Sequence, residues 1–395
     1  MATWVRDGAE VAVRGLALPY VLGLRWLERR GRPLPAGAPD GGRGLARGVK
    51  VAVDELFFAT EFLAGSSAAF LDGARIRGEV EDAVAMYDEC GWLARPERYH
   101  VTPPPLRTLD VTAGATPGLA YLHARFASEY APWAGEPGRA RWLDHVPNRT
   151  AHAWLYRHPG RERPWLVCLP AYRMGHPRVD ALGFRVRQLH HGLGLNVAVP
   201  VFPCHGPRAL GRRSGDGFLA GDFLDTIHAQ AQAVWEARRL IGWLRRQGAP
   251  AVGAYGLSLG AYTATLLASL EDDLACVIAG IPAIDFLELI QANSSAPLVW
   301  ATTQLGFPWD AIRTMLRVIS PLALARRVPV ERCYLFAGAA DALAPRAQVL
   351  DLWRHWGEPR LAWYEGGHVT FLFEQEVHRF VTTALRETGL AVRTC

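Results

Sequence analysis

The chain has 395 residues, half of them apolar, and can bury one large core; single α/β domains of this general size are ordinary. Its formal net charge of +5 comes from 43 basic and 38 acidic residues that are scattered singly along the chain. Because nucleic-acid binding depends on clustered Lys and Arg, this pattern argues against a nucleic-acid partner.

The cysteines and histidines indicate neither a disulfide framework nor a metal site. The six cysteines lack CxxC spacing, and several lie in strand-like runs, where a reduced thiol acts as a small apolar residue. His190, His191 and His205 have no carboxylates at a spacing typical of metal ligands. We therefore expect no metal and no disulfide cross-links.

The amino-terminal region is not predicted to cross a membrane. Its longest uncharged apolar stretch, residues 15–24, has about 10 residues, whereas a membrane-spanning helix needs about 20. The first residues, MATWVRDGAE, also differ from a signal peptide, which has a basic start and a small-residue cleavage site. These features favour a cytoplasmic protein.

Residues 1 to about 100 are predicted to form a helical amino-terminal extension. Pro19 is well placed to open a helix whose apolar residues from Tyr20 to Leu27 lie at helical spacing. The basic edge at residues 25–30 is compatible with peripheral membrane contact, but the apolar stripe can also pack on the rest of the protein, and we prefer packing. The apolar segment 51–71 has the same two interpretations.

From residue 101 onward we predict a catalytic domain of the α/β class. Short β-rich runs alternate with helical ones from about residue 118, which is typical of a mostly parallel sheet covered by helices on both faces. The helix between Gly221 and Gly248 is the clearest, because its apolar residues recur at three- and four-residue steps and Gly248 supplies a C-cap. The candidate strands are GLAYLHARF, TAHAWLYRH, PWLVCLP, LNVAVPV, AVGAY, LACVIAG, RCYLFAG and RLAWY.

A longer, helical connection separates the strands LACVIAG and RCYLFAG, at about residues 283–331. One interpretation is a cap whose apolar side chains line a pocket over the active site. The other is an insertion that buries these side chains against the domain beneath it, and the sequence favours neither.

A nucleophile motif follows the strand AVGAY. The pentapeptide Gly256-Leu257-Ser258-Leu259-Gly260 lies directly after this strand and directly before a helix rich in Ala, Leu and Thr. A sharp strand-to-helix turn needs glycines on both sides of the serine to relieve crowding. It also leaves the serine Oγ at a helix amino terminus, which favours developing negative charge. We therefore interpret GxSxG as a nucleophile elbow, with a chance Gly-rich turn as the alternative.

The histidine and the acid that activate a serine are expected after it, in the order Ser, acid, His. Of the histidines beyond Ser258, His355 and His378 lie in helical runs, whereas His368 follows the strand RLAWY in a loop with two glycines. We therefore choose His368 as the base.

Two aspartates are candidates for the acid. Asp341 follows the strand RCYLFAG in the loop AGAADALAP, which is expected at the carboxyl edge of the sheet. Asp285 follows the strand LACVIAG, but it is placed to start a helix, where the helix dipole stabilises an acid that has no catalytic role. Asp341 is therefore the predicted triad acid, and Asp285 is the alternative.

The oxyanion hole is expected to combine two backbone N–H groups. One is that of Leu259, directly after the nucleophile, and the other comes from Ala171 or Tyr172, in the loop after the strand PWLVCLP.

In these features the sequence resembles the α/β-hydrolase superfamily, over roughly positions 105 to 390, with Ser258, Asp341 and His368 in that family's order and context. The stretch from PCHGPR to LLASL is more narrowly similar to α/β-hydrolase-domain-containing proteins with a helical amino-terminal extension. The resemblance implies a doubly wound sheet of about eight strands, no cofactor, and hydrolysis of an ester, thioester or amide. Pro170-Ala171 replaces the family's usual His-Gly, which leaves an acyltransferase or an inactive protein as alternatives.

The functional prediction is a serine hydrolase that acts on a small-molecule acyl ester through an acyl-enzyme. An apolar acyl group is preferred because the connection at residues 283–331 is rich in apolar residues. The second hypothesis is a non-catalytic binding protein that retains the fold. All the residues predicted for catalysis lie beyond the amino-terminal extension.

Overall fold

The computed structural model describes residues 18–20, 22–23, 45–64, 73–219, 222–293, 300, 302–304 and 306–391. Most of the helix predicted to start at Pro19, with its basic edge at residues 25–30, lies outside these residues. So do residues 65–71 of the second apolar segment and residues 294–299 of the predicted cap.

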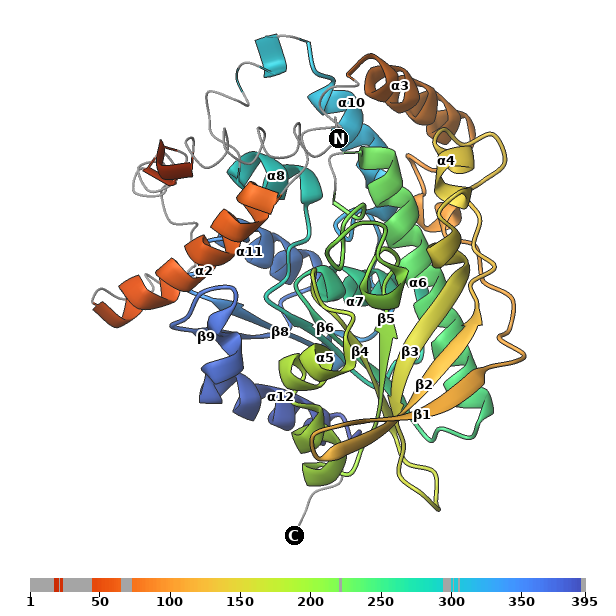
Figure 1. Cartoon of the computed structure of the whole chain (residues 1–395), viewed down its shortest axis with the longest axis vertical. Coiled ribbons are helices and arrows are strands. Elements are labelled where there is room, and N and C mark those ends of the chain that lie inside the picture. The colour runs from red at the N-terminus through yellow and green to blue at the C-terminus, as the bar shows by residue number, and fades with distance from the viewer. Residues whose placement is uncertain are drawn as a thin grey trace, which may run out of the picture.

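A sheet of nine strands forms the centre of the protein, in the order β1-β2-β3-β5-β4-β6-β7-β8-β9 (Figure 1). Strands β1, β2, β3 and β5 pair antiparallel, and β5, β4, β6, β7, β8 and β9 pair parallel. The strands are β1 (Asp110–Thr116), β2 (Leu119–Ala127), β3 (Thr150–Tyr156), β4 (Trp165–Leu169), β5 (Asn196–Val201), β6 (Val252–Leu257), β7 (Val277–Gly280), β8 (Cys333–Gly338) and β9 (Arg360–Tyr364). The predicted α/β class and mostly parallel sheet are confirmed.

Strand β1 was not predicted from the sequence, which explains why the sheet has nine strands and not about eight. Its sequence DVTAGAT has neither a continuous apolar run nor a strict alternation, and only Thr116 is buried. An edge strand of this kind is held by its register with β2, a property that its own composition does not encode.

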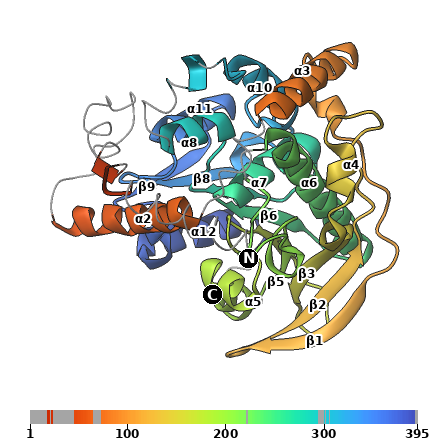
Figure 2. The ribbon, with the colours of Figure 1, turned by 45° about the horizontal axis from the view of Figure 1, so that its top comes forward.

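Helices cover both faces of the sheet (Figure 1, Figure 2). One face packs against α3 (Gly73–Glu89), α6 (Phe223–Arg246), α7 (Leu259–Leu270), α10 (Trp309–Met315) and α11 (Arg346–His355). The other face packs against α5 (Pro177–Gly183) and α12 (Gln375–Glu387). Since α3 buries Ile76, Val80 and Tyr87 in the core that contains α6 and α7, this part of the amino-terminal extension is packed into the catalytic domain.

The helix α6 matches the strongest helical pattern of the sequence. Asp222 is its N-cap and accepts a hydrogen bond from the Asp225 N–H, and the left-handed Gly248 (φ +90°) follows its last turn. The buried side of α6 carries Glu236, whose carboxylate binds the Arg208 guanidinium with N–O distances of 2.6 and 2.8 Å. Because Arg208 is fully buried and Glu236 is 4% exposed, this ion pair fixes the loop after β5 against α6.

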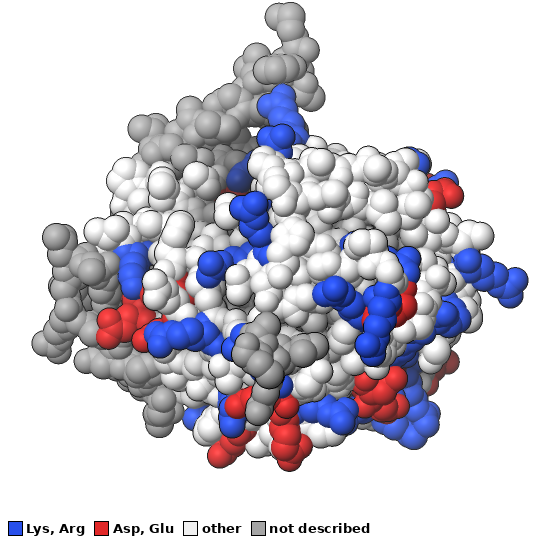
Figure 3. Space-filling view, turned by 90° about the horizontal axis from the view of Figure 1, so that it is seen from below, with Lys and Arg blue, Asp and Glu red and all other residues white. Residues whose placement is uncertain are grey.

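Surface charges of both signs are interspersed on the face seen from below (Figure 3). Within the part of the chain that the structure describes, no helix is long and apolar enough to cross a membrane.

We predict that Glu236→Gln lowers the free energy of unfolding by about 3–5 kcal/mol, because it leaves the buried Arg208 charge without its anionic partner. Urea unfolding of the purified proteins measures this change. Asp351→Asn is the matched control: its pair with Arg354 is about half exposed, so it should shift stability by less than about 1 kcal/mol. Equal, small effects of both substitutions would contradict this role of the buried pair.

Candidate active site

The turn between β6 and α7 places Ser258 at the amino terminus of α7. Ser258 has φ +52° and ψ −112°, a backbone conformation that is costly for any residue other than glycine. A Cβ on Gly256 would collide with the Gly260 carbonyl, and a Cβ on Gly260 would collide with the Leu169 carbonyl at the end of β4. Both glycines of the motif are therefore required by the close approach of strand and helix, which is the geometry expected of a nucleophile elbow.

A hydrogen-bonded chain connects Ser258, His368 and Asp341. The His368 Nε2 lies 2.9 Å from the Ser258 Oγ, and the His368 Nδ1 lies 2.7 Å from an Asp341 carboxylate oxygen. Because a carboxylate only accepts hydrogen bonds, Nδ1 carries the proton and Nε2 is free to accept the proton of the serine hydroxyl. The structure thus brings together three side chains that are far apart in the sequence.

Local hydrogen bonds hold Asp341 and His368 in place. The second carboxylate oxygen of Asp341 accepts the N–H groups of Leu343 and Ala344, at 2.8 and 2.9 Å. In the loop after β9, the Tyr364 hydroxyl donates to the Gly367 carbonyl at 2.7 Å, so the backbone before His368 is fixed.

The environment of His368 raises its basicity. His368 is 9% exposed, and burial lowers its pKa, but the negative charge of Asp341, the hydrogen bond to it and the charge of Asp54 outweigh burial. The pKa of His368 is therefore raised above its ordinary value of 6.5.

Asp54 is a residue of this site that sequence reasoning missed. It lies on α2 (Leu45–Ala64), is fully buried, and its carboxylate accepts the backbone N–H of His368 at 2.6 Å. A signal was present: Lys50, Asp54 and Glu61 recur at four- and seven-residue steps, which places three charged side chains on one side of a largely apolar helix.

The helix α2 includes residues 51–64 of the apolar segment 51–71, and it packs on the protein through only some of its apolar side chains. The apolar residues Val49, Val53 and Leu56 are exposed, at 58%, 38% and 66%, whereas Asp54 and Phe58 face the protein. The helix packs through a side that includes buried charge because it finds backbone N–H donors there.

The predicted oxyanion donors lie in adjacent segments. Leu259 is the first residue of α7, and Ala171 and Tyr172 are in the loop after β4, against which Gly260 packs. The Ala171 N–H donates to the Met174 sulfur at 3.2 Å, a weak acceptor that a stronger one can replace. The Tyr172 ring packs against the Arg173 guanidinium, 4.5 Å from the ring centroid, and Arg173 in turn binds Glu61 of α2.

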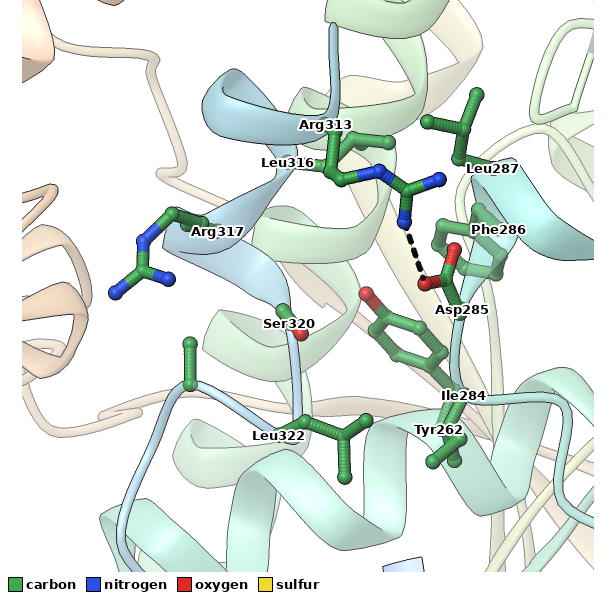
Figure 4. Close-up of a pocket in the computed structure, with 11 residues that line it drawn as sticks. Tyr262, Ile284, Asp285, Phe286, Leu287, Arg313, Leu316, Arg317, Ser320 and Leu322 are labelled. Atoms are coloured by element: carbon green, nitrogen blue, oxygen red, sulfur yellow. Dashed lines mark hydrogen bonds and ion pairs between the residues drawn. The ribbon is translucent and has the colours of Figure 1, made fainter. Parts of the chain in front are cut away.

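Asp285, the alternative acid, serves a different purpose. One carboxylate oxygen accepts the Glu288 N–H at 2.8 Å, at the start of α8 (Phe286–Asn293), and the other lies 3.5 Å from Arg313 (Figure 4). The histidine is bound by Asp341 instead.

A cavity of about 180 Å³ lies beside Asp285, between α7, α8 and the residues that follow α10 (Figure 4). Tyr262, one turn after Ser258 on α7, forms part of its wall and stacks on Phe286 with ring centroids 4.1 Å apart. Phe286 and Leu287 are almost completely buried, so these apolar residues of the predicted cap pack on the domain beneath and also border the cavity.

The histidines considered as metal ligands have other contacts. The His190 Nδ1 binds the Leu195 carbonyl, and the His205 Nδ1 binds the Pro203 carbonyl, both at 2.8 Å. Among the described residues, no group of three or more His, Cys, Asp or Glu side chains is arranged to hold a metal ion.

Two proteins of Mycobacterium tuberculosis are similar in sequence to this chain. They are named Uncharacterized protein MT2702, from strain CDC 1551 / Oshkosh, and Uncharacterized protein Rv2627c, from strain ATCC 25618 / H37Rv. Each is 41% identical over 321 residues, which covers 80% of this chain and 76% of the mycobacterial protein. No family model matches the chain.

Solved structures support the fold. Acetyl xylan esterase 1 from Thermoanaerobacterium sp. JW/SL YS485 aligns with a TM-score of 0.51 and 14% identity, over 75% of this chain and 93% of the esterase. The acetyl xylan esterase from Paenibacillus sp. R4 aligns with a TM-score of 0.50 and 14% identity, over 79% of this chain and 95% of its own. Because only 14% of the residues are identical, the likeness shows a common fold and no more, and this fold is the α/β-hydrolase fold.

We predict that Gly260→Ala destabilises the protein by about 1–3 kcal/mol or more, because the new methyl group overlaps the Leu169 carbonyl. The control is Gly242→Ala in the interior of α6, where the nearest atom is the flexible end of Arg246 and alanine favours the helix by about 1 kcal/mol. Chemical denaturation compares the two variants. A Gly260→Ala protein as stable as Gly242→Ala would show that the elbow is less crowded than described.

Proposed function

Because this chain belongs to the family of the M. tuberculosis proteins MT2702 and Rv2627c and has the α/β-hydrolase fold, we propose that it is a serine hydrolase that cleaves a carboxylic ester. The observation that carries the proposal is the chain of hydrogen bonds from the strained Ser258 through His368 to Asp341. A serine hydroxyl becomes a nucleophile only when a neighbouring base removes its proton, and this arrangement supplies one.

In the proposed reaction, the Ser258 Oγ attacks the ester carbonyl carbon while the His368 Nε2 takes the hydroxyl proton. Asp341 stabilises the imidazolium that forms, and the N–H of Leu259 with that of Ala171 or Tyr172 binds the oxyanion. His368 then gives its proton to the leaving alkoxide, which departs as an alcohol. A water molecule, activated by the same imidazole, hydrolyses the acyl-enzyme and regenerates Ser258.

An apolar acyl group is the substrate feature that we propose. It is supported by the apolar side chains of Ile284, Leu287 and Leu316 in the cavity whose wall includes Tyr262, the residue one helical turn after Ser258. A series of p-nitrophenyl esters of increasing acyl length measures this preference.

We predict that a fluorophosphonate labels the wild-type protein on Ser258. Ser258→Ala should abolish labelling and ester hydrolysis while the protein stays folded, because the substitution removes only the nucleophilic oxygen. Mass spectrometry of the labelled protein locates the modified residue. Labelling that survives in Ser258→Ala would refute the assignment of the nucleophile.

Matched amide substitutions test which of the two aspartates, Asp341 or Asp285, is the acid of the triad. Asp341→Asn should lower kcat by a factor on the order of 10⁴, because an amide presents the wrong hydrogen-bonding pattern to the His368 Nδ1. Asp285→Asn should leave kcat within a few-fold and cost about 0.5–1 kcal/mol of stability, because this side chain caps a helix. Both are assayed on the best ester found, with melting temperatures compared; a near-normal kcat in Asp341→Asn together with a collapse in Asp285→Asn would reverse the assignment.

A further inference from the structure

The helix α2 lies alongside the end of β9 (Figure 1, Figure 2). Its side chains contact the loops after β4, β8 and β9. Near its start, Lys50 binds Glu374 at 2.6 Å and the Glu365 carbonyl at 3.0 Å. Near its end, Glu61 binds Arg173 at 2.6 Å, in the loop that carries Ala171 and Tyr172. Asp54 lies between these anchors.

The Asp54 carboxylate joins the loop of the acid to the loop of the base. One of its oxygens accepts the N–H of Ala342, directly after Asp341, at 3.0 Å and the N–H of His368 at 2.6 Å. The other oxygen accepts the N–H of Val369 at 3.0 Å. A single side chain thus sets the spacing between the two backbone segments whose side chains form the bond from His368 to Asp341.

The fit of Asp54 against these loops is close. A Cβ on Gly367 would lie 2.5 Å from an Asp54 carboxylate oxygen, so the glycine before His368 is needed to admit this carboxylate.

Attachment of α2 does not by itself account for a buried charge at this position. The helix is already anchored by the ion pairs at its two ends and by the burial of Phe58 and Ala59. Burial and the charge of Asp341 raise the pKa of the Asp54 carboxyl, while His368 and the N–H groups of Val369 and Ala342 act in the opposite direction. A second carboxylate beside Asp341 therefore lowers the stability of the fold. The benefit that offsets this cost is its effect on His368.

We propose that Asp54 is a positioning residue for the reaction proposed above: it holds the loops of Asp341 and His368 in register and adds a second negative charge beside the imidazole. The inference rests on the proposed function, and it makes α2 part of the catalytic unit. Asp54 acts through His368 and Asp341 and touches no reacting atom.

The test is Asp54→Asn, which keeps the size of the side chain but removes its charge and presents an NH₂ group to at least one of the backbone donors. A displacement of the base by about 1 Å can cost on the order of 10²-fold, so we expect kcat to fall by about 10- to 100-fold, with KM little changed. The pH dependence of kcat supplies the second readout.

The direction of the pH shift follows from the charges. The groups that face His368 are Asp341 from the loop after β8, Asp54 from α2 and Ser258 from the elbow, with Tyr364 and the Lys50–Glu374 pair farther out. The base must be neutral, so activity rises with pH through the pKa of His368. Since removing the charge of Asp54 lowers this pKa, the rising limb should move to lower pH in Asp54→Asn.

Glu61→Gln is the matched control, because it removes one negative charge from the same helix at a point that contacts Arg173 and Arg213. We expect it to lower the melting temperature and to leave the pH limb where it is. If the role of α2 were purely structural, both variants would lose stability and activity together, and the rising limb of the pH dependence of kcat would stay in place in both. This result would overturn the inference.

A second variant keeps the test independent of how well the amide is accommodated. In Asp54→Ala, added formate should restore part of kcat and return the limb toward higher pH, because it supplies a small carboxylate to the space left by the side chain. Failure of formate to change either quantity, with wild-type pH dependence in Asp54→Asn, would also overturn the inference. A wild-type protein that neither reacts with fluorophosphonate nor hydrolyses esters would instead refute the proposed function.

Discussion

The reversal of the chain at Ser258 is the constraint on which the rest of the site depends. β6 and α7 are both fully buried, and β6 lies between two parallel neighbours, so the turn between them has no free side into which it could expand. Gly256 and Gly260 have no side chains, which allows β6 and α7 to approach each other closely. Gly260 also lets α7 contact the carbonyl of Leu169. The nucleophile is thereby fixed to the loop after β4 by backbone contact.

The parts of the fold that could be predicted are those with a local signal. Every strand predicted from the sequence is present, because each has a local pattern of its own. β4, β5, β6, β7 and β8 are short apolar runs that are fully buried, whereas β2, β3 and β9 are only partly buried. Ser258, Asp341 and His368 could be chosen for a related reason: each follows a predicted strand, and the carboxyl ends of parallel strands meet at one edge of the sheet. β1 has no such signal, since it is exposed and depends on its pairing with β2.

Asp54 illustrates what local patterns leave out. It lies 314 positions before His368, and the donors that stabilise its charge are backbone N–H groups, which every non-proline residue has and which therefore leave no mark in a sequence. Its helix turns Val49 and Leu56 outward while it buries Phe58, so a rule that places all apolar side chains inward does not identify the buried side. The sequence shows that Asp54 is an acid within an apolar helix, but it does not show the backbone N–H groups that this acid binds.

The charges around His368 favour the state that the proposed reaction creates. In the resting site a neutral imidazole lies beside two buried carboxylates, and burial together with the charge of Asp341 raises the pKa of Asp54. Backbone N–H groups offset part of this cost, three of them at Asp54 and two at Asp341. When Ser258 loses its proton to His368, the new positive charge is bonded to Asp341 and attracted by Asp54, which offsets part of the repulsion between the two carboxylates. Because this gain arises only after proton transfer, it stabilises the transition state more than the resting enzyme, and it requires both carboxylates to be held in place before the substrate arrives.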